Sequence, residues 1–544
     1  MNKKNIWIAC GVALTGVVLL ILGIAIGRGL GNGLSRTSPA GYDKLNAVLN
    51  MIDEQYVDTV NKQDLTELTI KALMESLDPH SEYIPKSQLT AVNEDLDGSF
   101  SGVGISFQIV QDTVTVVEVI TGGPAEKLGI LAGDRIIKAD NKPLAGPGVT
   151  NDDVFKTLRG KKGTKVTLSV LRRGASEPLP FTLTRDDIPV NSVDVAYMLD
   201  DKKTGYLKLS KFTRNTFQEF IDALVELDAQ GAKELIIDLR NNPGGYLDQA
   251  ALIANELLPE GSMIVYTRSR TPENVLEMKA DGTGSHQKIP VAVLINEYSA
   301  SASEIIAGAI QDNDRGVIIG RRSFGKGLVQ NQTTLPDSSA IRLTVARYFT
   351  PSGRSIQKEY KIGEGLEYDM DIVQRYNRGE FYHLDSIKLD KTKPFRTLRG
   401  RTVYGGGGIM PDVFVPEDTT QVTSWYIAVS NAGLIQQYAF ALAESYRRIL
   451  GDNKNVAQIL KILPADDQLV HQFAEYAESK GVPARWYYIN ISAPMVANQL
   501  KAFIVRDLAG YDQFYRIFNS DDRTIKAAVD VLKSGKIPVK TLSR

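Results

Sequence analysis

Between Asn296 and Gln330 the sequence carries three serines at one turn, Ser299, Ser301 and Ser303, and one lysine, Lys326. A serine hydroxyl is a weak nucleophile until a neighbouring group takes its proton. A lysine can take that proton only when neutral, so burial or nearby positive charge must lower its pKa from about 10.4 by roughly three units. Gly325 and Gly327 flank Lys326 and would let the backbone lie close to other structure, burying the ammonium group. The stretch therefore offers a nucleophile and a general base.

Two other interpretations compete for the same residues. Ser301 and Glu304 also match a helix capping box, in which Ser301 caps the helix and Glu304 reaches back to it. The sequence GRRSFGK, residues 320–326, resembles a phosphate-binding P-loop. The P-loop interpretation fails twice, because Gly327 stands where the magnesium-binding Ser or Thr should be, and the next residues predict a strand instead of a helix. The capping interpretation stays open.

A glycine turn upstream offers a second chemical feature. The sequence KELIIDLRNNPGG, residues 233–245, predicts an apolar strand that runs into a Gly-Gly turn. A backbone N–H of Gly244 or Gly245 could stabilise a developing oxyanion, together with the N–H of Ala302. A simple helix entry is the safer interpretation of the turn taken alone.

The elements that must position these residues alternate between strand and helix. Strands are predicted at residues 205–209, 263–266 and 291–295, with a helix after the first strand and another after the glycine turn. This alternation indicates an α/β fold.

Residues 97–186 differ in character, with short alternating strands separated by glycine-rich turns. They contain GVGI (Gly102, Val103, Gly104 and Ile105) and GGPAEKLGILAGDRIIKADNKPL, residues 122–144. This segment resembles a PDZ domain. The resemblance implies that the GVGI backbone N–H groups receive the C-terminal carboxylate of a peptide that adds as a strand. The simpler alternative is that Gly102 and Gly104 only shape the entry to a strand.

Composition argues against several other functions. The 63 basic and 64 acidic residues nearly cancel, which leaves no general basic field for nucleic acid. A single cysteine excludes an intramolecular disulfide framework and a cysteine-rich zinc site. The histidines are scattered singly, at His80, His286, His383 and His471. We therefore expect no nucleic-acid partner, no metal and no cofactor.

An uncharged, mostly apolar run of 22 positions, residues 6–27, is long enough as a helix to cross a membrane. A cleaved signal peptide is the alternative, but its apolar run is usually only about 7–15 residues long. Lys3 and Lys4 favour a cytoplasmic N-terminus, although Arg28 and Arg36 weaken that inference. We predict a single-pass anchor in the cytoplasmic (inner) membrane, with the globular part on the extracytoplasmic, periplasmic side.

Helical spacing of apolar residues predicts two amphipathic helices after a flexible linker at residues 28–40. The turn that ends them, LDPHSEY at residues 77–83, is interpreted as structural, with His80 as a hydrogen-bonded turn residue.

Several motifs in order now match one family. SASASE (residues 299–304), FGKGLVQ (324–330), DLRNNPGG (238–245) and the PDZ-like segment together resemble the C-terminal processing peptidases, also called tail-specific proteases. The resemblance extends from about residue 42 to residue 416. It implies a crotonase-like α/β core with a PDZ domain inserted near its start, and endoproteolysis through an acyl-enzyme.

The resemblance also implies roles for single residues. Ser301 would be the nucleophile, Lys326 the general base, 25 positions later, and Gln330 the residue that positions the lysine. Gln330 lies four positions beyond Lys326, so in a strand both side chains would face the same way. The oxyanion donors would be the backbone of Ala302 and of Gly244 or its neighbour. His286 offers an alternative base, 15 residues before Ser301, in a polar Gly-Ser loop.

Residues 354–393 are charged and rich in Tyr, and are interpreted as an exposed excursion. Four apolar stripes after residue 417 predict a helical domain that either packs internally or serves for self-association or adaptor binding. The predicted order is a cytoplasmic N-terminus (1–5), anchor (6–27), linker (28–40), N-terminal helical part of the peptidase (41–96), PDZ domain (97–187), peptidase core (188–355), insertion (356–399), end of the core (400–418) and helical C-terminal domain (419–544).

Two functions follow. The first is a membrane-anchored serine endopeptidase acting on proteins with unstructured C-termini. The second is a membrane-tethered PDZ scaffold that binds such tails with an inactive peptidase-like domain. The presence of Ser301, Lys326 and Gln330 together favours the enzyme.

Overall fold

A computed structural model describes residues 40–535, apart from positions 111, 173, 272, 274, 364, 389, 393 and 452–454. The anchor predicted at residues 6–27 lies outside this range. In the range described, no helix combines the length and the apolar character needed to span a bilayer. The chain divides into two compact units, residues 1–73 and 74–544.

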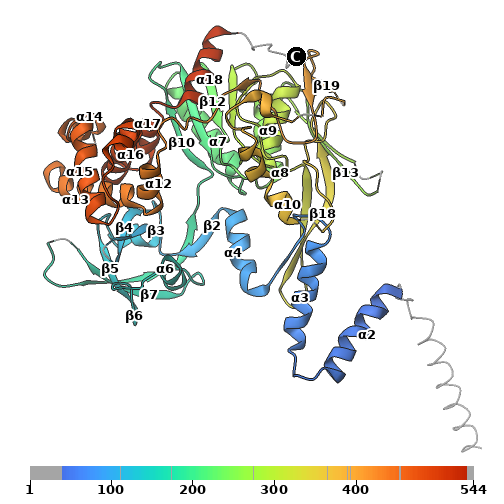
Figure 1. Ribbon diagram of the computed structural model, residues 1–544, viewed down its shortest axis with the longest axis horizontal. Helices are drawn as coiled ribbons and strands as arrows, with labels where there is room; N and C mark the ends of the chain where they lie inside the picture. Colours follow the sequence, from blue (N-terminus) through green and yellow to red (C-terminus); the bar gives the residue numbers. More distant parts are fainter. Residues whose placement is uncertain are drawn as a thin grey trace, which may run out of the picture. The chain divides into compact units, whose positions relative to one another are not determined.

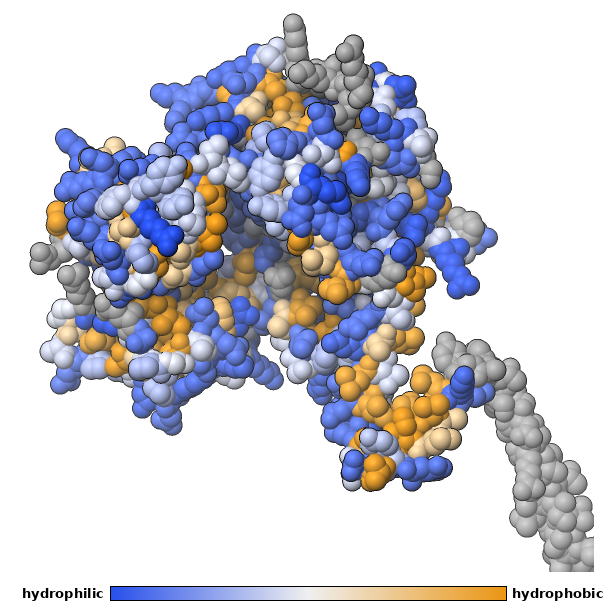
Figure 2. All heavy atoms as spheres, viewed as in Figure 1, coloured by the Kyte–Doolittle hydropathy of each residue, from blue (hydrophilic) through white to orange (hydrophobic). Residues whose placement is uncertain are grey.

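The first unit forms helix α2 (Ala40–Gln55) and most of α3 (Lys62–Glu75), as the apolar spacing predicts. The apolar faces of these helices remain exposed, since Leu45, Val48 and Leu68 keep 41%, 46% and 64% of their surface. Figure 2 shows apolar surface along this part of the chain. The two helices described for residues 40–73 do not by themselves enclose a core.

The second unit opens with β1 (Glu82–Ile84) and α4 (Lys86–Asp97), and then forms a mainly β domain. Its entry strand β2 (Ser99–Gly102) pairs antiparallel with its exit strand β9 (Asp186–Pro189). The chain therefore enters and leaves this domain at the same place. Between them lies a sheet of order β3-β4-β5-β7-β8, with β6 beside β5. These elements are β3 (Ile105–Val110), β4 (Thr113–Val119), α5 (Pro124–Lys127), β5 (Arg135–Ala139), β6 (Lys142–Pro143), α6 (Asn151–Leu158), β7 (Lys165–Leu171) and β8 (Leu179–Thr184).

A six-stranded sheet of order β10-β11-β12-β15-β16-β21 forms the centre of the second unit (Figure 1). β10 is antiparallel to β11, and the other neighbours are parallel. The strands are β10 (Val193–Met198), β11 (Thr204–Leu209), β12 (Glu234–Asp238), β15 (Val291–Ile295), β16 (Val317–Gly320) and β21 (Val413–Phe414). Every residue of β12 and β15 is buried, which explains the continuous apolar sequence of β15 and the apolar centre of β12 between Glu234 and Asp238.

Helices cover both faces of this sheet. Helices α7 (Thr216–Ala229), α8 (Leu247–Leu257) and α9 (Ala302–Asp312) share one apolar core with one face. The other face packs against α18 (Arg523–Ser534), through Ile525, Ala528 and Leu532. Figure 1 shows α18, in red, beside β12. Because β12 and β15 are parallel neighbours, the glycine turn after β12 and the serine turn after β15 lie at the same edge of the sheet.

A second sheet, of order β1-β18-β13-β14 with β17 also paired to β18, supplies the lysine segment. Its strands are β13 (Met263–Ser269), β14 (Val275–Lys279), β17 (Leu328–Thr334) and β18 (Ala340–Phe349). Lys326 therefore lies just before β17, not within it.

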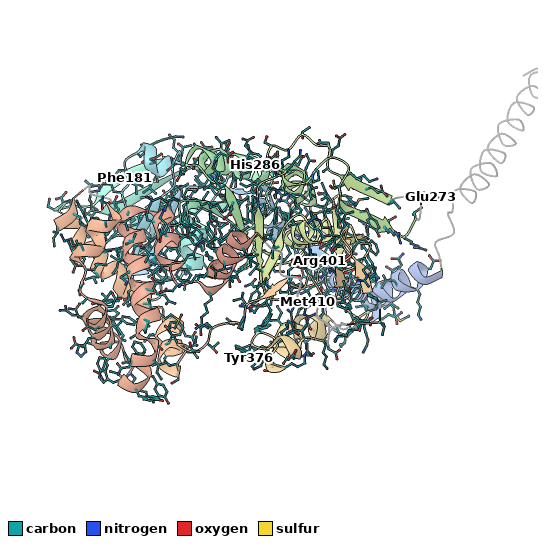
Figure 3. All side chains as sticks on the ribbon, turned by 90° about the horizontal axis from the view of Figure 1, so that it is seen from above. Phe181, Glu273, His286, Tyr376, Arg401 and Met410 are labelled. Atoms are coloured by element: carbon teal, nitrogen blue, oxygen red, sulfur yellow. The ribbon has the colours of Figure 1, made fainter. Side chains whose placement is uncertain are left out.

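The expectation of an exposed excursion after residue 354 is wrong for several of its charged residues. This segment forms α10 (Gly365–Asp369), α11 (Asp371–Asn377), a 3-10 turn (Leu384–Ser386), β19 (Pro394–Arg396) and β20 (Thr402–Tyr404). Arg375 is 1% exposed and donates to the carbonyl oxygens of Arg322 (2.7 Å) and Ser323 (3.0 Å), while Glu380 pairs with both arginines. Burial of these charges is tolerated because Glu380 pairs with both arginines and backbone carbonyl oxygens accept the other N–H groups of Arg375. Tyr376 of α11 is labelled in Figure 3.

Helices α12 to α17 enclose an apolar core of their own, centred on Leu469, Phe473 and Leu500. They are α12 (Ser424–Asn431), α13 (Leu434–Leu450), α14 (Val456–Ile462), α15 (Asp466–Ser479), α16 (Trp486–Ala509) and α17 (Tyr511–Phe518). The first three predicted stripes fall here. The fourth stripe is that of α18, which belongs to the core of the central sheet instead.

The position of α18 predicts how the fold responds to its disruption. Ala528→Asp places a carboxylate with no partner against the sheet, since Ala528 is 0% exposed. We expect the free energy of unfolding to fall by several kcal/mol. Asp530→Ala, an exposed change on the same helix, serves as control. Chemical denaturation of both variants measures the effect, and equal stabilities would contradict the packing of α18 on the sheet.

Candidate active site

Ser301 lies in the turn between β15 and α9, in a backbone conformation unusual for its type. Its φ of 55° and ψ of −113° fall in a region that costs about 1–3 kcal/mol for a residue other than glycine. The neighbouring serines are occupied in building the turn. Ser299 Oγ donates to the carbonyl oxygen of Leu239 (2.8 Å), and Ser303 Oγ to that of Asn242 (3.0 Å). Both neighbours are fully buried and Ser301 is half-buried, which singles out Ser301 for chemistry.

The carboxylate of Glu304 joins the serine turn to the lysine segment. Its Oε2 accepts the backbone N–H of Ser301 (2.9 Å) and that of Lys326 (2.8 Å). Its Oε1 accepts the N–H of Gly325 (2.7 Å) and the hydroxyl of Ser323 (2.5 Å). Burial raises the pKa of Glu304 to about 7, against the pull of these four donors. Glu304 accepts the backbone N–H of Ser301, as the glutamate of a capping box does. The same carboxylate also fixes the backbone of Lys326.

Tyr348 of β18 joins the same two segments from their carbonyl side. Its hydroxyl is shared between the carbonyl oxygens of Lys326 (2.7 Å) and Ser301 (3.1 Å), and the side chain is 1% exposed. Both backbone polar groups of Ser301 and of Lys326 are thus held by common partners. The two residues lie side by side although 25 positions separate them.

The surroundings of Lys326 favour a neutral amine. Burial lowers the pKa of Lys326, as does the charge of Arg342, while Glu82, Glu304 and Asp78 oppose the shift. In the part of the chain that the structure describes, no carboxylate forms a salt bridge with this lysine. The direction of the shift is the one that a general base requires.

The glycine turn lies directly against Ser301. A Cβ added to Gly244 would lie 2.7 Å from the carbonyl oxygen of Ala300 and 2.9 Å from the nitrogen of Ala302. At Gly245, a Cβ would meet the carbonyl oxygen of Phe212 at 2.0 Å. Glycine at position 244 keeps the space beside the Ala302 N–H open, and glycine at position 245 lets the turn pass close to the backbone of Phe212.

One predicted oxyanion donor is corrected by these contacts. The N–H of Gly244 donates to Asn242 Oδ1 (2.9 Å), so it is directed into its own turn. Asn242 is held in turn by its bond to the carbonyl oxygen of Leu209 (3.0 Å). The absence of a side chain at Gly244 leaves room beside Ser301. The backbone N–H groups of Ala302 and Gly245 remain the predicted oxyanion donors.

Comparison with known proteins matches residues 203–372 to the sequence model of peptidase family S41 and residues 101–183 to that of the PDZ domain. A carboxy-terminal-processing protease of Bartonella bacilliformis is 34% identical over 422 residues, which cover 77% of this chain and 93% of that protein. The chain belongs to the carboxy-terminal-processing proteases of peptidase family S41. The resemblance read from the sequence is thereby confirmed, as are the peptidase fold, the PDZ domain and the helical C-terminal region.

Further relatives fit the same family. A probable CtpA-like serine protease of Staphylococcus aureus is 32% identical over 66% of this chain and 70% of that protein. A solved photosystem II D1 C-terminal processing protease is 32% identical, over 56% of this chain and 82% of that chain, with a TM-score of 0.32. Residues 425–510 match a family of unknown function, DUF8443.

Strand alternation does not direct the Gln330 side chain, contrary to the prediction. Lys326 precedes β17, and a bulge shifts the register between Val329 and Gln330. A bulge breaks the alternation of side chains, so spacing does not set the direction of Gln330. A hydrogen bond from Gln330 Nε2 to Thr344 Oγ1 (3.2 Å) holds the side chain instead.

His286 has the contacts of a structural residue. Its Nδ1 lies 2.6 Å from Glu256 Oε1 and its Nε2 lies 2.9 Å from Asp228 Oδ2. Both ring nitrogens therefore have carboxylate partners, and neither is left to accept a proton from Ser301. These bonds raise the pKa of His286 against the effect of its burial. Figure 3 labels this histidine.

In the PDZ domain, the four predicted peptide-binding residues link two strands. Gly102 ends β2, Val103 and Gly104 follow, and Ile105 begins β3. Beside them lies a cavity of about 600 Å³. Its lining includes Phe100 of β2, Ile105 and Phe107 of β3, Asn151 and Phe155 of α6, and Arg159 directly after α6. It also includes Tyr511 and Asp512 from α17. No pattern in the sequence indicated the two residues of α17.

Glu304→Gln is expected to lose at least about nine-tenths of the peptidase activity. The amide keeps the shape of the carboxylate but turns one acceptor into an NH₂ group that faces donors, which costs about 1–3 kcal/mol for each buried donor left without a partner. Turnover of an unfolded protein with an apolar C-terminal tail measures the loss. Glu256→Gln, a change at another buried carboxylate, is the control. Full activity in Glu304→Gln would contradict the bridging role.

Proposed function

We propose that this chain is a serine endopeptidase of the Ser-Lys type that cleaves proteins through an acyl-enzyme. The observation that carries the proposal is the bridge through Glu304, which receives the N–H of both Ser301 and Lys326 on one oxygen. The turn that contains Gly244 lies close to the backbone nitrogen of Ala302. This contact supports the proposal of an oxyanion site beside Ser301.

The chemistry follows from these positions. Lys326 Nζ accepts the proton of Ser301 Oγ while Oγ attacks the peptide carbonyl carbon, and the carbonyl oxygen becomes an oxyanion bound by the N–H groups of Ala302 and Gly245. The lysine then gives its proton to the leaving amine as the C–N bond breaks. Water attacks the ester with Lys326 again as base, which releases the new carboxylate and restores the Ser301 hydroxyl. Gln330 holds the amine in place.

The substrates we propose are proteins that present unstructured C-terminal tails. The cavity of the PDZ domain has the apolar side chains of Phe107 and Phe155 in its lining and the GVGI backbone at residues 102–105 beside it. An apolar tail would add along β3, with its carboxylate at the GVGI backbone, and so bring the rest of the chain to the peptidase.

Ser301→Ala and Lys326→Ala are each expected to abolish cleavage of an unfolded, apolar-tailed substrate while folding is retained. Ser301→Ala removes the nucleophile and Lys326→Ala removes the base, so turnover should fall by at least about a hundredfold in each. Mass spectrometry of the cut ends measures cleavage, and His286→Ala is the control that should keep activity. Full activity in either variant would contradict the assignment. Tail binding without any cleavage by the unmodified protein would favour the PDZ scaffold.

We further propose that residues 6–27 anchor the enzyme in the cytoplasmic membrane, with the catalytic part outside the cytoplasm. The 22 uncharged positions after Lys3 and Lys4 support this. The full chain should sediment with carbonate-washed membranes, and protease added to spheroplasts should digest the globular part. A chain that starts at residue 40 should be recovered in the soluble fraction. Recovery of the full chain there, or its protection from the protease, would contradict this location.

A further inference from the structure

A chain of side-chain hydrogen bonds connects the turn at residues 78–81 to Gln330. The hydroxyl of Thr344 donates to Asp78 Oδ1 (3.0 Å), and Gln330 Nε2 donates to Thr344 Oγ1 (3.2 Å). We propose that Asp78 and Thr344 are positioning residues, which direct the amide oxygen of Gln330 toward Lys326. This inference rests on the proposed Ser-Lys mechanism.

The direction of each bond follows from the groups themselves. The Asp78 carboxylate already receives the N–H groups of His80 (2.9 Å) and Ser81 (3.0 Å) on Oδ1, and the hydroxyl of Ser81 (2.5 Å) on Oδ2. An ionised carboxylate only accepts, so Thr344 must donate its single hydroxyl proton to it. Thr344 Oγ1 is then left as an acceptor, and the Gln330 amide must present its NH₂ group. Its oxygen becomes the end that can accept from the lysine amine.

The relay is anchored on rigid structure. Asp78 is 7% exposed, and Ser81 Oγ also accepts the backbone N–H of Thr344 (3.1 Å). Directly beyond this turn, β1 pairs with β18, with Tyr83 opposite Ile341. The turn and the strand are therefore held together at two adjacent points, and Thr344 has little freedom to move.

A tether of this kind is needed because the backbone does not orient Gln330. The bulge between Val329 and Gln330 breaks the strand alternation, and Thr344 is the residue opposite Gln330 in the register. The turn lies near the base, since the charge of Asp78 acts on Lys326 and that of Lys326 on His80. Among the described residues, the charged and titratable groups around Lys326 include Asp78, His80, Glu82, Glu304, Arg342, Tyr348 and Lys358.

The test compares Thr344→Val, Thr344→Ser and Thr333→Val, an exposed Thr on the neighbouring strand, by their kcat and KM for an apolar-tailed unfolded protein. Thr344→Val keeps the shape but loses the hydroxyl, and we expect kcat to fall about tenfold or more with KM unchanged. Thr344→Ser keeps the hydroxyl and should restore most of kcat, and Thr333→Val should match the unmodified enzyme. In a Gln330→Ala background, Thr344→Val should cause no further loss, because the relay acts only through Gln330.

The pH profile gives a second readout. An amide oxygen that accepts from the lysine stabilises its ammonium form, so loss of the relay should move the acidic limb of kcat to lower pH while the plateau falls. Unchanged kcat in Thr344→Val, with Ser301→Ala and Lys326→Ala inactive, would overturn the relay and leave the proposed mechanism intact. A loss that Thr344→Ser does not restore, or one that persists in the Gln330→Ala background, would also overturn it. Activity in Lys326→Ala would overturn the mechanism itself.

Discussion

The arrangement of this site depends on one buried carboxylate. Glu304 accepts four hydrogen bonds, two from the serine turn and lysine segment backbones and two more from Ser323 and Gly325. A buried carboxyl group is costly unless its oxygens accept hydrogen bonds. Burial of Glu304 therefore requires the serine turn and the lysine segment to be in place at the same time. The same requirement sets the backbones of Ser301 and Lys326 side by side. The fold therefore positions the proposed nucleophile and base as a condition of burying Glu304.

The central sheet brings the remaining parts to this point. Its neighbouring strands β12 and β15 end at the same edge, where the glycine turn meets the serine turn. The end of β12 is held by Asp238, which pairs with Arg240, and Arg240 also donates to Asp522 Oδ2 (2.8 Å). Asp522 is the N-cap of α18. The last described helix thus supports the strand that leads into the glycine turn, from the face of the sheet opposite α9.

The sequence contained a recognisable pattern for the candidate nucleophile and base, but none for the contacts that hold them in place. Residue types and the family spacing predicted Ser301 and Lys326, because a nucleophile and a base leave a motif within one short stretch. The contacts that hold them join residues far apart, as with Asp78 and Thr344, which are separated by 266 positions. Such a pair leaves no local pattern in the sequence. The turn at residues 77–83 was therefore interpreted only as structural.

Two other differences have the same physical origin. The direction of Gln330 could not be predicted because a bulge, which depends on the partner strand, breaks the alternation that the spacing assumed. The charged segment after residue 354 read as exposed, since charge predicts exposure unless a partner is present. The partners of Arg375, among them the carbonyl oxygens of residues 322 and 323, are provided by the fold alone.

The central claim is that Ser301 is activated by a lysine whose pKa the fold lowers. It is tested most directly by the rate at which a fluorophosphonate labels the protein between pH 6 and 11, with the adduct located by mass spectrometry of its peptides. The account predicts a single adduct, on Ser301, with a rate that is half-maximal well below the ordinary lysine pKa of about 10.4. An adduct on another residue, or a half-maximum at about 10.4, would contradict it.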